Sequence, residues 1–328
     1  MPALSKNQKV FKKYFHLPVE LRIMVVEEME SNDRCRFRRS SRMNDKEVKI
    51  SKNVCYKLKF EAFPDSPISI EVAFSKKDII SYALNFVEEE SKKLMRCSDV
   101  ENKELWKVEL DSSTNLPLYA ADQFKELLRI YQNKIKKLEI YGTLFETKLK
   151  NYDFGIKSLR NVDELHINGY TENLHYFSKL RCPLKELYAV VVANDRILTD
   201  CQEVYEVQKF LVTPYTKFTR EQFSKLSAEY VTIDIGDLTE MDIFHFIRSW
   251  QNGTIKKKIE CYTWQMEKDS TWDIPKLLRL LGIEFDFDRE RGFEIDIFNE
   301  SKNRAKLRYI VNDDDYDENV NHLLFKVE

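Results

Sequence analysis

Short segments in which one residue of any kind separates two apolar residues recur from residue 108 to residue 261, at steps of about 21 to 30 residues. Alternation over such short lengths is typical of a β-strand with one face turned to a core. The pattern therefore predicts a series of short strands: Val108–Leu110, Leu138–Ile140, Leu165–Ile167, Leu187–Ala189, Phe210–Val212, Val231–Ile233 and Ile259–Cys261.

Apolar residues at helical spacing fall between several of these strands. The first set is Phe124, Leu127, Leu128 and Tyr131, and a second helix follows a capping box of Thr219 and Gln222. The clearest helix begins after Thr239, continues through Ile243, Phe246, Ile247 and Trp250, and has Gly253 as its C-terminal stop.

Strand, helix and parallel strand in succession form a right-handed coil, and leucine-rich repeats are ~20–29 residues long. The spacing therefore predicts an α/β fold in which residues 105–328 form an irregular leucine-rich-repeat-like αβ solenoid. An unrelated α/β domain with the same strand spacing is the alternative.

The region before the array has its own pattern. Segments 54–60 and 68–74 are β-prone, and Ser75 and Asp78 suit a capping box before a helix over residues 79–87. Residues 53–104 are therefore predicted to form a connecting αβ region.

The N-terminal segment contains a helix that is apolar on more than one side. Leu17 and Pro18 open it, since proline is tolerated at the first helical position. The apolar residues that follow spread around most of the circumference: Leu21, Ile23, Met24, Val25, Val26 and Met29. Such a helix needs a core on one side and a partner on the other, or else a central place within a single domain.

The next residues favour the partner. After a break at residues 31–33 come Arg34, Phe37, Arg38, Arg42 and Met43, in a segment predicted to fold back on the first helix. Together with Leu17-Pro18-Val19-Glu20-Leu21, this segment resembles the F-box, in the variant common in nematode F-box families. The resemblance implies a three-helix F-box over residues 1–52. The stretch 246–260 also resembles the F-box-associated region of such proteins. This second resemblance implies that segments 293–297, 305–307 and 324–327 are closing antiparallel strands, which would form a β-rich C-terminal cap on the array.

This resemblance implies a non-catalytic function. The chain would be the substrate-recognition subunit of a cullin-RING ubiquitin ligase of the SCF type, located in the cytoplasm, the nucleus or both. A Skp-family adaptor, and through it a cullin, would bind the N-terminal module, while the C-terminal array would bind a protein target for degradation. The adaptor contacts carried over are Leu17, Pro18, Leu21, Ile23, Met24, Val25 and Phe37. A repeat scaffold without a ligase role is the alternative.

Residues beside each inward apolar pair should point to the open face of the predicted sheet. The expected target-binding residues are Glu139, Tyr141, His166, Tyr188, Thr232, Glu260 and Tyr262. Tyrosines suit this role because they bury a large area at a small entropic cost. An ordinary amphipathic surface is the alternative for each of them.

Composition narrows the classes of function. The 328 residues carry a formal net charge of −2 and only 7 glycines, and no glycine cluster of the kind that cradles phosphate is present. The histidines and cysteines lack the spacing of zinc ligands, and the acidic run from Asp313 lacks the glycine and final carboxylate of a calcium loop. We therefore expect no metal and no cofactor.

Membrane and nucleic-acid partners are also not expected. The apolar runs are far shorter than the ~20 residues that span a bilayer, and the six cysteines form no Cys-x-x-Cys pair, which indicates free thiols. The arginines from Arg34 to Arg42 have no aromatic platform beside them and belong to the F-box resemblance.

Overall fold

The computed structural model describes residues 18–29, 55–74, 82–99, 103–131, 135–142, 149, 152–155, 159–170, 184–192, 207–213, 219–255, 257–267, 272–288, 291–311 and 320–328. The strands in these ranges form one mixed sheet of fourteen strands, in the order β12-β13-β14-β11-β10-β9-β8-β7-β6-β1-β2-β3-β4-β5. The chain divides into two compact units, the first made of residues 1–139 with 148–161 and the second of residues 140–147 with 162–328.

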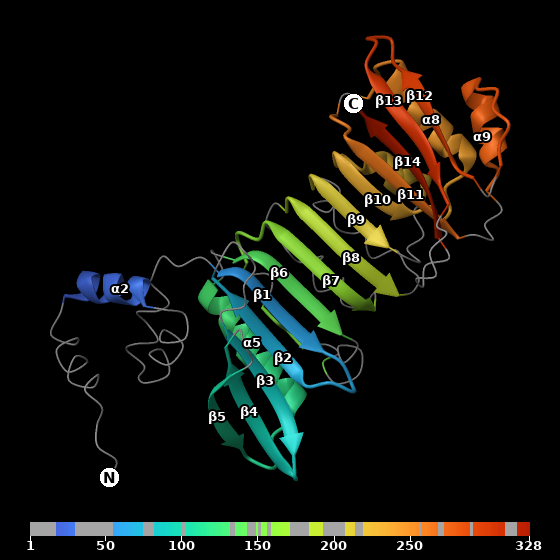
Figure 1. Cartoon of the computed structure of the whole chain (residues 1–328). Coiled ribbons are helices and arrows are strands. Elements are labelled where there is room, and N and C mark those ends of the chain that lie inside the picture. Colours follow the sequence, from blue (N-terminus) through green and yellow to red (C-terminus); the bar gives the residue numbers. More distant parts are fainter. Residues whose placement is uncertain are drawn as a thin grey trace, which may run out of the picture. The chain divides into compact units, whose positions relative to one another are not determined.

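The described part of the first unit contains an antiparallel meander and the helices α2 and α5 (Figure 1). Its elements are α2 (Val19–Glu28), β1 (Cys55–Ala62), β2 (Ile68–Ala73), β3 (Tyr82–Glu89), β4 (Lys92–Ser98), β5 (Glu104–Leu110), α5 (Leu116–Tyr131) and most of β6 (Ile135–Gly142). Each of β1 to β4 pairs antiparallel with the strand that follows it. The apolar face of α5 packs on this sheet, where Phe124 stacks on Phe60 of β1 with ring centroids 4.9 Å apart.

The second unit contains the parallel strands. Its elements are β7 (Glu164–Tyr170), β8 (Glu186–Val192), β9 (Lys209–Thr213), α7 (Arg220–Lys225), β10 (Tyr230–Asp234), α8 (Glu240–Gln251), β11 (Cys261–Glu267), α9 (Ile274–Leu281), β12 (Phe293–Phe298), β13 (Arg304–Ile310) and β14 (Val320–Val327). Strands β7 to β11 pair in parallel in sequence order. Strand β14 pairs antiparallel with both β11 and β13, so it lies between two strands that precede it in the chain.

The core of this unit lies between the sheet and its helices. Register places two neighbouring rows of side chains on the helix side of the strands, and both are buried across β7 to β11 and β14. One row is Leu165, Leu187, Phe210, Val231, Tyr262 and Phe325, and the other is Ile167, Ala189, Val212, Ile233, Trp264 and Leu323. Figure 1 shows α8 and α9 together on one side of these strands.

The predicted fold class is wrong. In a solenoid, repeats coil in one direction and each contacts only its neighbours. Here the parallel strands β7 to β11 belong to a mixed sheet that also contains the antiparallel strands β1 to β5 and β12 to β14, and no leucine-rich-repeat solenoid is seen among the described residues. The segment Val108–Leu110, predicted as the first strand of the array, belongs to β5 of the meander.

The three-helix F-box fold is not seen either. Of residues 1–54 the structure describes 18–29, which hold the single helix α2. The second predicted helix, with Phe37, lies outside the described residues. The predicted boundaries at residues 52 and 104 stay predictions.

The helix predicted over residues 79–87 is also wrong, because its described part is strand β3. Tyr82, Leu84 and Phe86 alternate on the buried face, and Phe86 lies opposite Ile68 of β2. By contrast, α5, α7 and α8 are confirmed where the apolar spacing predicts them. Strands β12 to β14 contain the three segments expected as antiparallel cap strands.

Candidate binding surfaces

Helix α2 carries an exposed apolar stripe. Leu21, Met24 and Val25 stand in an i, i+3, i+4 relation, which places them on one face, and their exposed fractions are 45%, 57% and 38%. Val26 is buried and Ile23 is half-buried. Because apolar side chains face both a covered and an uncovered side, α2 is apolar around most of its circumference, as its sequence predicts.

Of the predicted adaptor contacts outside the helix, the structure describes Pro18. Pro18 precedes the helix as its N-cap and is exposed, and its carbonyl accepts a hydrogen bond from the Arg22 N–H at 3.1 Å. Leu17 and Phe37 lie outside the described residues. Among the described residues, the exposed stripe consists of Leu21, Met24 and Val25.

The second unit presents a surface on the side of its sheet away from α7 and α8. Register aligns one row of side chains across six neighbouring strands. We call this set the outer row: His166, Tyr188, Leu211, Thr232, Thr263 and Leu324, all half-buried. His166 and Tyr188 stack with ring centroids 5.1 Å apart.

The outer row contains three of the seven predicted target-binding residues: His166, Tyr188 and Thr232. Two others, Tyr141 on β6 and Glu260 just before β11, are half-buried and do not belong to the row. Sequence reasoning missed Leu211, Thr263 and Leu324. Leu211 could have been found, because it lies between the two inward residues of a predicted strand, as Thr232 does.

Tyr262 and Glu139 are corrections, because both were expected on the exposed face. Tyr262 is fully buried, its hydroxyl donates to the Ala228 carbonyl at 2.9 Å, and burial raises the pKa of that hydroxyl. The inward residues before and within β11 are Ile259 and Tyr262, so the alternation shifts by one residue at Glu260, and a shift of one residue exchanges the two faces. Glu139 is buried on β6, with its Oε1 2.9 Å from Lys137 Nζ.

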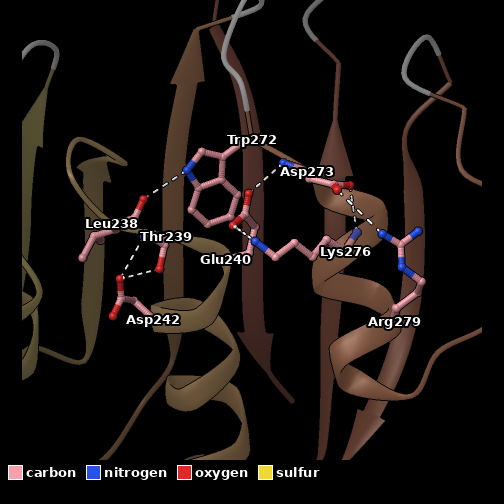
Figure 2. Close-up of polar contacts among 8 residues, drawn as sticks. All are labelled: Leu238, Thr239, Glu240, Asp242, Trp272, Asp273, Lys276 and Arg279. Carbon is pink, nitrogen blue, oxygen red and sulfur yellow. Dashed lines mark hydrogen bonds and ion pairs between the residues drawn. The ribbon is translucent and has the colours of Figure 1, made fainter.

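A polar cluster at the beginnings of α8 and α9 has no counterpart in the predictions. In Figure 2 the Glu240 carboxylate accepts hydrogen bonds from the Asp273 backbone N–H, at 2.9 Å, and from the Lys276 ammonium, at 3.1 Å. Asp273 is the N-cap of α9, and its carboxylate accepts the Lys276 backbone N–H at 2.9 Å. Burial raises the pKa of Glu240, but the bonds from Asp273 and Lys276 outweigh it and hold the pKa below its usual value.

The neighbouring groups in Figure 2 are also bonded within the protein. The Trp272 indole N–H donates to the Leu238 carbonyl at 3.1 Å, and Asp242 accepts the Thr239 N–H at 2.9 Å. These carboxylates hold the first turns of two helices, where negative charge stabilises the helix end. Their bonds are those of a structural junction that fixes α9 against α8.

Two results concern ligands and membranes. Among the described residues, no group of three or more His, Cys, Asp or Glu side chains is arranged to hold a metal ion. Within the same ranges, no helix has both the length and the apolar character needed to cross a membrane.

Comparison of the chain with protein-family models, curated proteins and solved structures gives no match. The candidate surfaces are therefore defined by geometry alone: the apolar stripe on α2 and the outer row of the second unit.

Proposed function

We propose that this chain is a substrate-recognition subunit of a cullin-RING ubiquitin ligase. In this proposal the N-terminal segment binds a Skp-family adaptor and the second unit binds a protein target. The observation that carries the proposal is the stripe of Leu21, Met24 and Val25 on α2. Exposed apolar anchors at i, i+3 and i+4 are the pattern by which a helix docks in a groove of another protein.

The sequence around this stripe supports the choice of partner. Residues 17–43 resemble the F-box, and the stripe coincides with three of the contacts that the resemblance implies. The target is brought close to the ligase, so the contribution of the chain is effective concentration rather than catalysis.

The test is copurification of the full chain with a purified Skp-family adaptor, using Leu21→Asp and Met24→Asp. Both side chains are exposed, so the variants are expected to fold as the parent does by circular dichroism and to lose the adaptor, since a buried unpaired carboxylate at the interface is costly. Phe298→Asp is the matched control, because Phe298 is 56% exposed on β12 against 57% for Met24, and it should keep the adaptor.

Two outcomes contradict the proposal. One is a parent chain that does not bind the adaptor. The other is binding that survives both α2 substitutions, and in that case the chain is a scaffold that uses its surfaces without a ligase.

A further inference from the structure

The parallel strands β7 to β11 carry helices on one face only in the described part of the chain. Phe223 of α7 and Phe246 of α8 pack over Tyr262 and Trp264, with ring centroids 4.7 to 6.3 Å apart. Parallel strands are usually covered on both faces. The outer row lies on the other face, and its side chains are only half-buried.

The outer row has the chemistry of a docking surface. Over its six strands it combines stacked aromatic rings, two leucines and two threonines. The same register continues on β13 to Arg308, which lies opposite Leu324 and pairs with Glu294. It crosses six strands, and five spacings of ~4.8 Å give a length of about 24 Å. An α-helix of about 16 residues has this length.

A helix is the form of partner that suits this direction. The strands use their backbone groups within the sheet, so a segment that crosses their face finds no backbone partners there. A helix satisfies its own N–H and C=O groups and can therefore lie across the strands without leaving them unpaired.

Like charges face each other beside both ends of the outer row. At the β7 end, Glu164 lies directly opposite Glu186. At the other end, Lys306 lies directly opposite Lys326. Like charges directly opposite are destabilising. A partner with the opposite charge at each end would add to the neutralisation that Lys209 gives Glu186 and that Glu294 gives Lys306.

The four charged residues differ in how far neighbouring side chains neutralise them. Glu186 has Lys209 Nζ 2.6 Å from its Oε1. Lys306 has Glu294 Oε1 at 2.5 Å and Glu328 Oε1 at 3.7 Å, whereas Lys326 is exposed and makes no ion pair with any described residue. Lys326 is therefore available to a carboxylate from a partner.

We propose that the outer row binds an amphipathic helical segment of the target protein. Its apolar face lies on Tyr188, Leu211 and Leu324, its acidic end lies over Lys306 and Lys326, and its basic end lies over Glu164 and Glu186. This inference rests on the proposed function, since it names the kind of target segment that the receptor recognises.

The test is selection of a displayed library of random 16-residue peptides on the full chain. The enriched peptides are expected to have apolar residues at i, i+3, i+4 and i+7, acidic residues at one end and basic residues at the other. Affinity of the enriched peptides is then measured by fluorescence anisotropy against Leu211→Asp, with Val87→Asp as the matched control, since Val87 is a half-buried apolar residue on β3 of the first unit.

Leu211→Asp should weaken the enriched peptides at least about tenfold, and Val87→Asp should leave their affinity unchanged. The exposed Lys326 gives a second variant that does not endanger folding. Lys326→Glu should weaken binding of the same peptides severalfold. A peptide whose acidic end is changed to lysine should regain this affinity with the Lys326→Glu variant and not with the parent.

Three results overturn the inference: no enrichment, enriched peptides that bind Leu211→Asp as well as the parent, or no recovery in the charge-reversal pair. The assay contains no adaptor, so it can fail while the α2 stripe still binds the Skp-family protein. Loss of the adaptor interaction, in turn, leaves the peptide result intact.

Discussion

Each unit leaves one face of its sheet without a helix among the described residues, and the two faces differ in chemistry. In the first unit, the face away from α5 carries charged side chains that pair with one another. Lys59 Nζ is 2.5 Å from Glu61 Oε2 and 3.3 Å from Glu71 Oε1. In the second unit, the outer row is aromatic, aliphatic and hydroxylic.

The difference separates a face that is complete by itself from one that gains by being covered. Opposite charges on neighbouring strands stabilise the sheet by pairing with one another. The burial of half-exposed apolar side chains by a partner is favourable, because it removes apolar surface from water. A partner is therefore expected on the sheet of the second unit.

The largest expected effect compares two residues that are neighbours in sequence. Phe210 faces the helices and is buried, while Leu211 belongs to the outer row. Phe210→Ala should lower the free energy of unfolding by about 3–5 kcal/mol, and Leu211→Ala by about 1 kcal/mol or less. Urea unfolding measures both, and a large loss for Leu211→Ala would show that the outer row is part of the core.

The next effect concerns the charged face of the first unit. Glu71→Ala should cost about 1 kcal/mol at low salt, because it removes a carboxylate from a lysine whose side chain is largely covered, and less at high salt. Glu109→Ala is the matched control. Its pair with Lys92 has the same 3.3 Å separation, but both side chains are exposed, so its loss should be near zero. Equal losses of stability in the two variants would mean that covering the side chains does not strengthen the ion pair.

The smallest effect is a pH dependence of opposite sign for one lysine in each unit. Burial lowers the pKa of Lys59, but Glu61 and Glu71 outweigh it and raise the pKa above its usual value. Burial lowers the pKa of Lys257 to about 8. Its ammonium donates to the Leu226 carbonyl and lies 5.4 Å from the ring centre of Tyr262.

The stabilisation from Lys59 is present below its unfolded pKa of about 10.4 and is lost as the pH rises through the higher folded pKa. The cost of burying Lys257 is present below pH 8 and is relieved as the pH rises from about 8 to 10.4, because the unfolded chain then binds more protons. Unfolding of Lys59→Met and Lys257→Met from pH 7 to 11 should shift the parent's pH dependence in opposite directions. A shift of the same sign in both would contradict the two environments.

Local signals predicted much of the secondary structure. Helices α7 and α8 begin after the predicted caps Thr219 and Thr239, and α8 ends near Gly253 as expected. These signals are reliable because caps act within one turn. Strand positions from β6 to β10 also followed from apolar spacing. Helix α9 was not predicted, although its signals are equally clear: Asp273 as N-cap, Pro275 in the first turn and Gly282 in the left-handed conformation.

The failures arose where the pattern is ambiguous or the cause is distant. Residues 82–87 fit both a helical and an alternating period, and pairing with β2 and β4 decides for a strand. The face of Tyr262 depends on a shift at Glu260, whose N–H donates to Glu229 and whose carbonyl accepts from Val327, residues far away in sequence. The mixed sheet itself follows from β14 pairing with β11, a contact that local spacing cannot reveal.

The position of β14 has a consequence for how the chain is made. Strands β11, β12 and β13 leave the ribosome before β14, yet β11 and β13 meet only through it. The edge of β13 that faces β14 therefore stays unpaired until residues 320–327 are synthesised and pair with both β11 and β13. Contacts over such sequence distance form slowly and leave strand edges open to wrong partners. A nascent chain that pauses in this stretch is the form of the protein most in need of a chaperone.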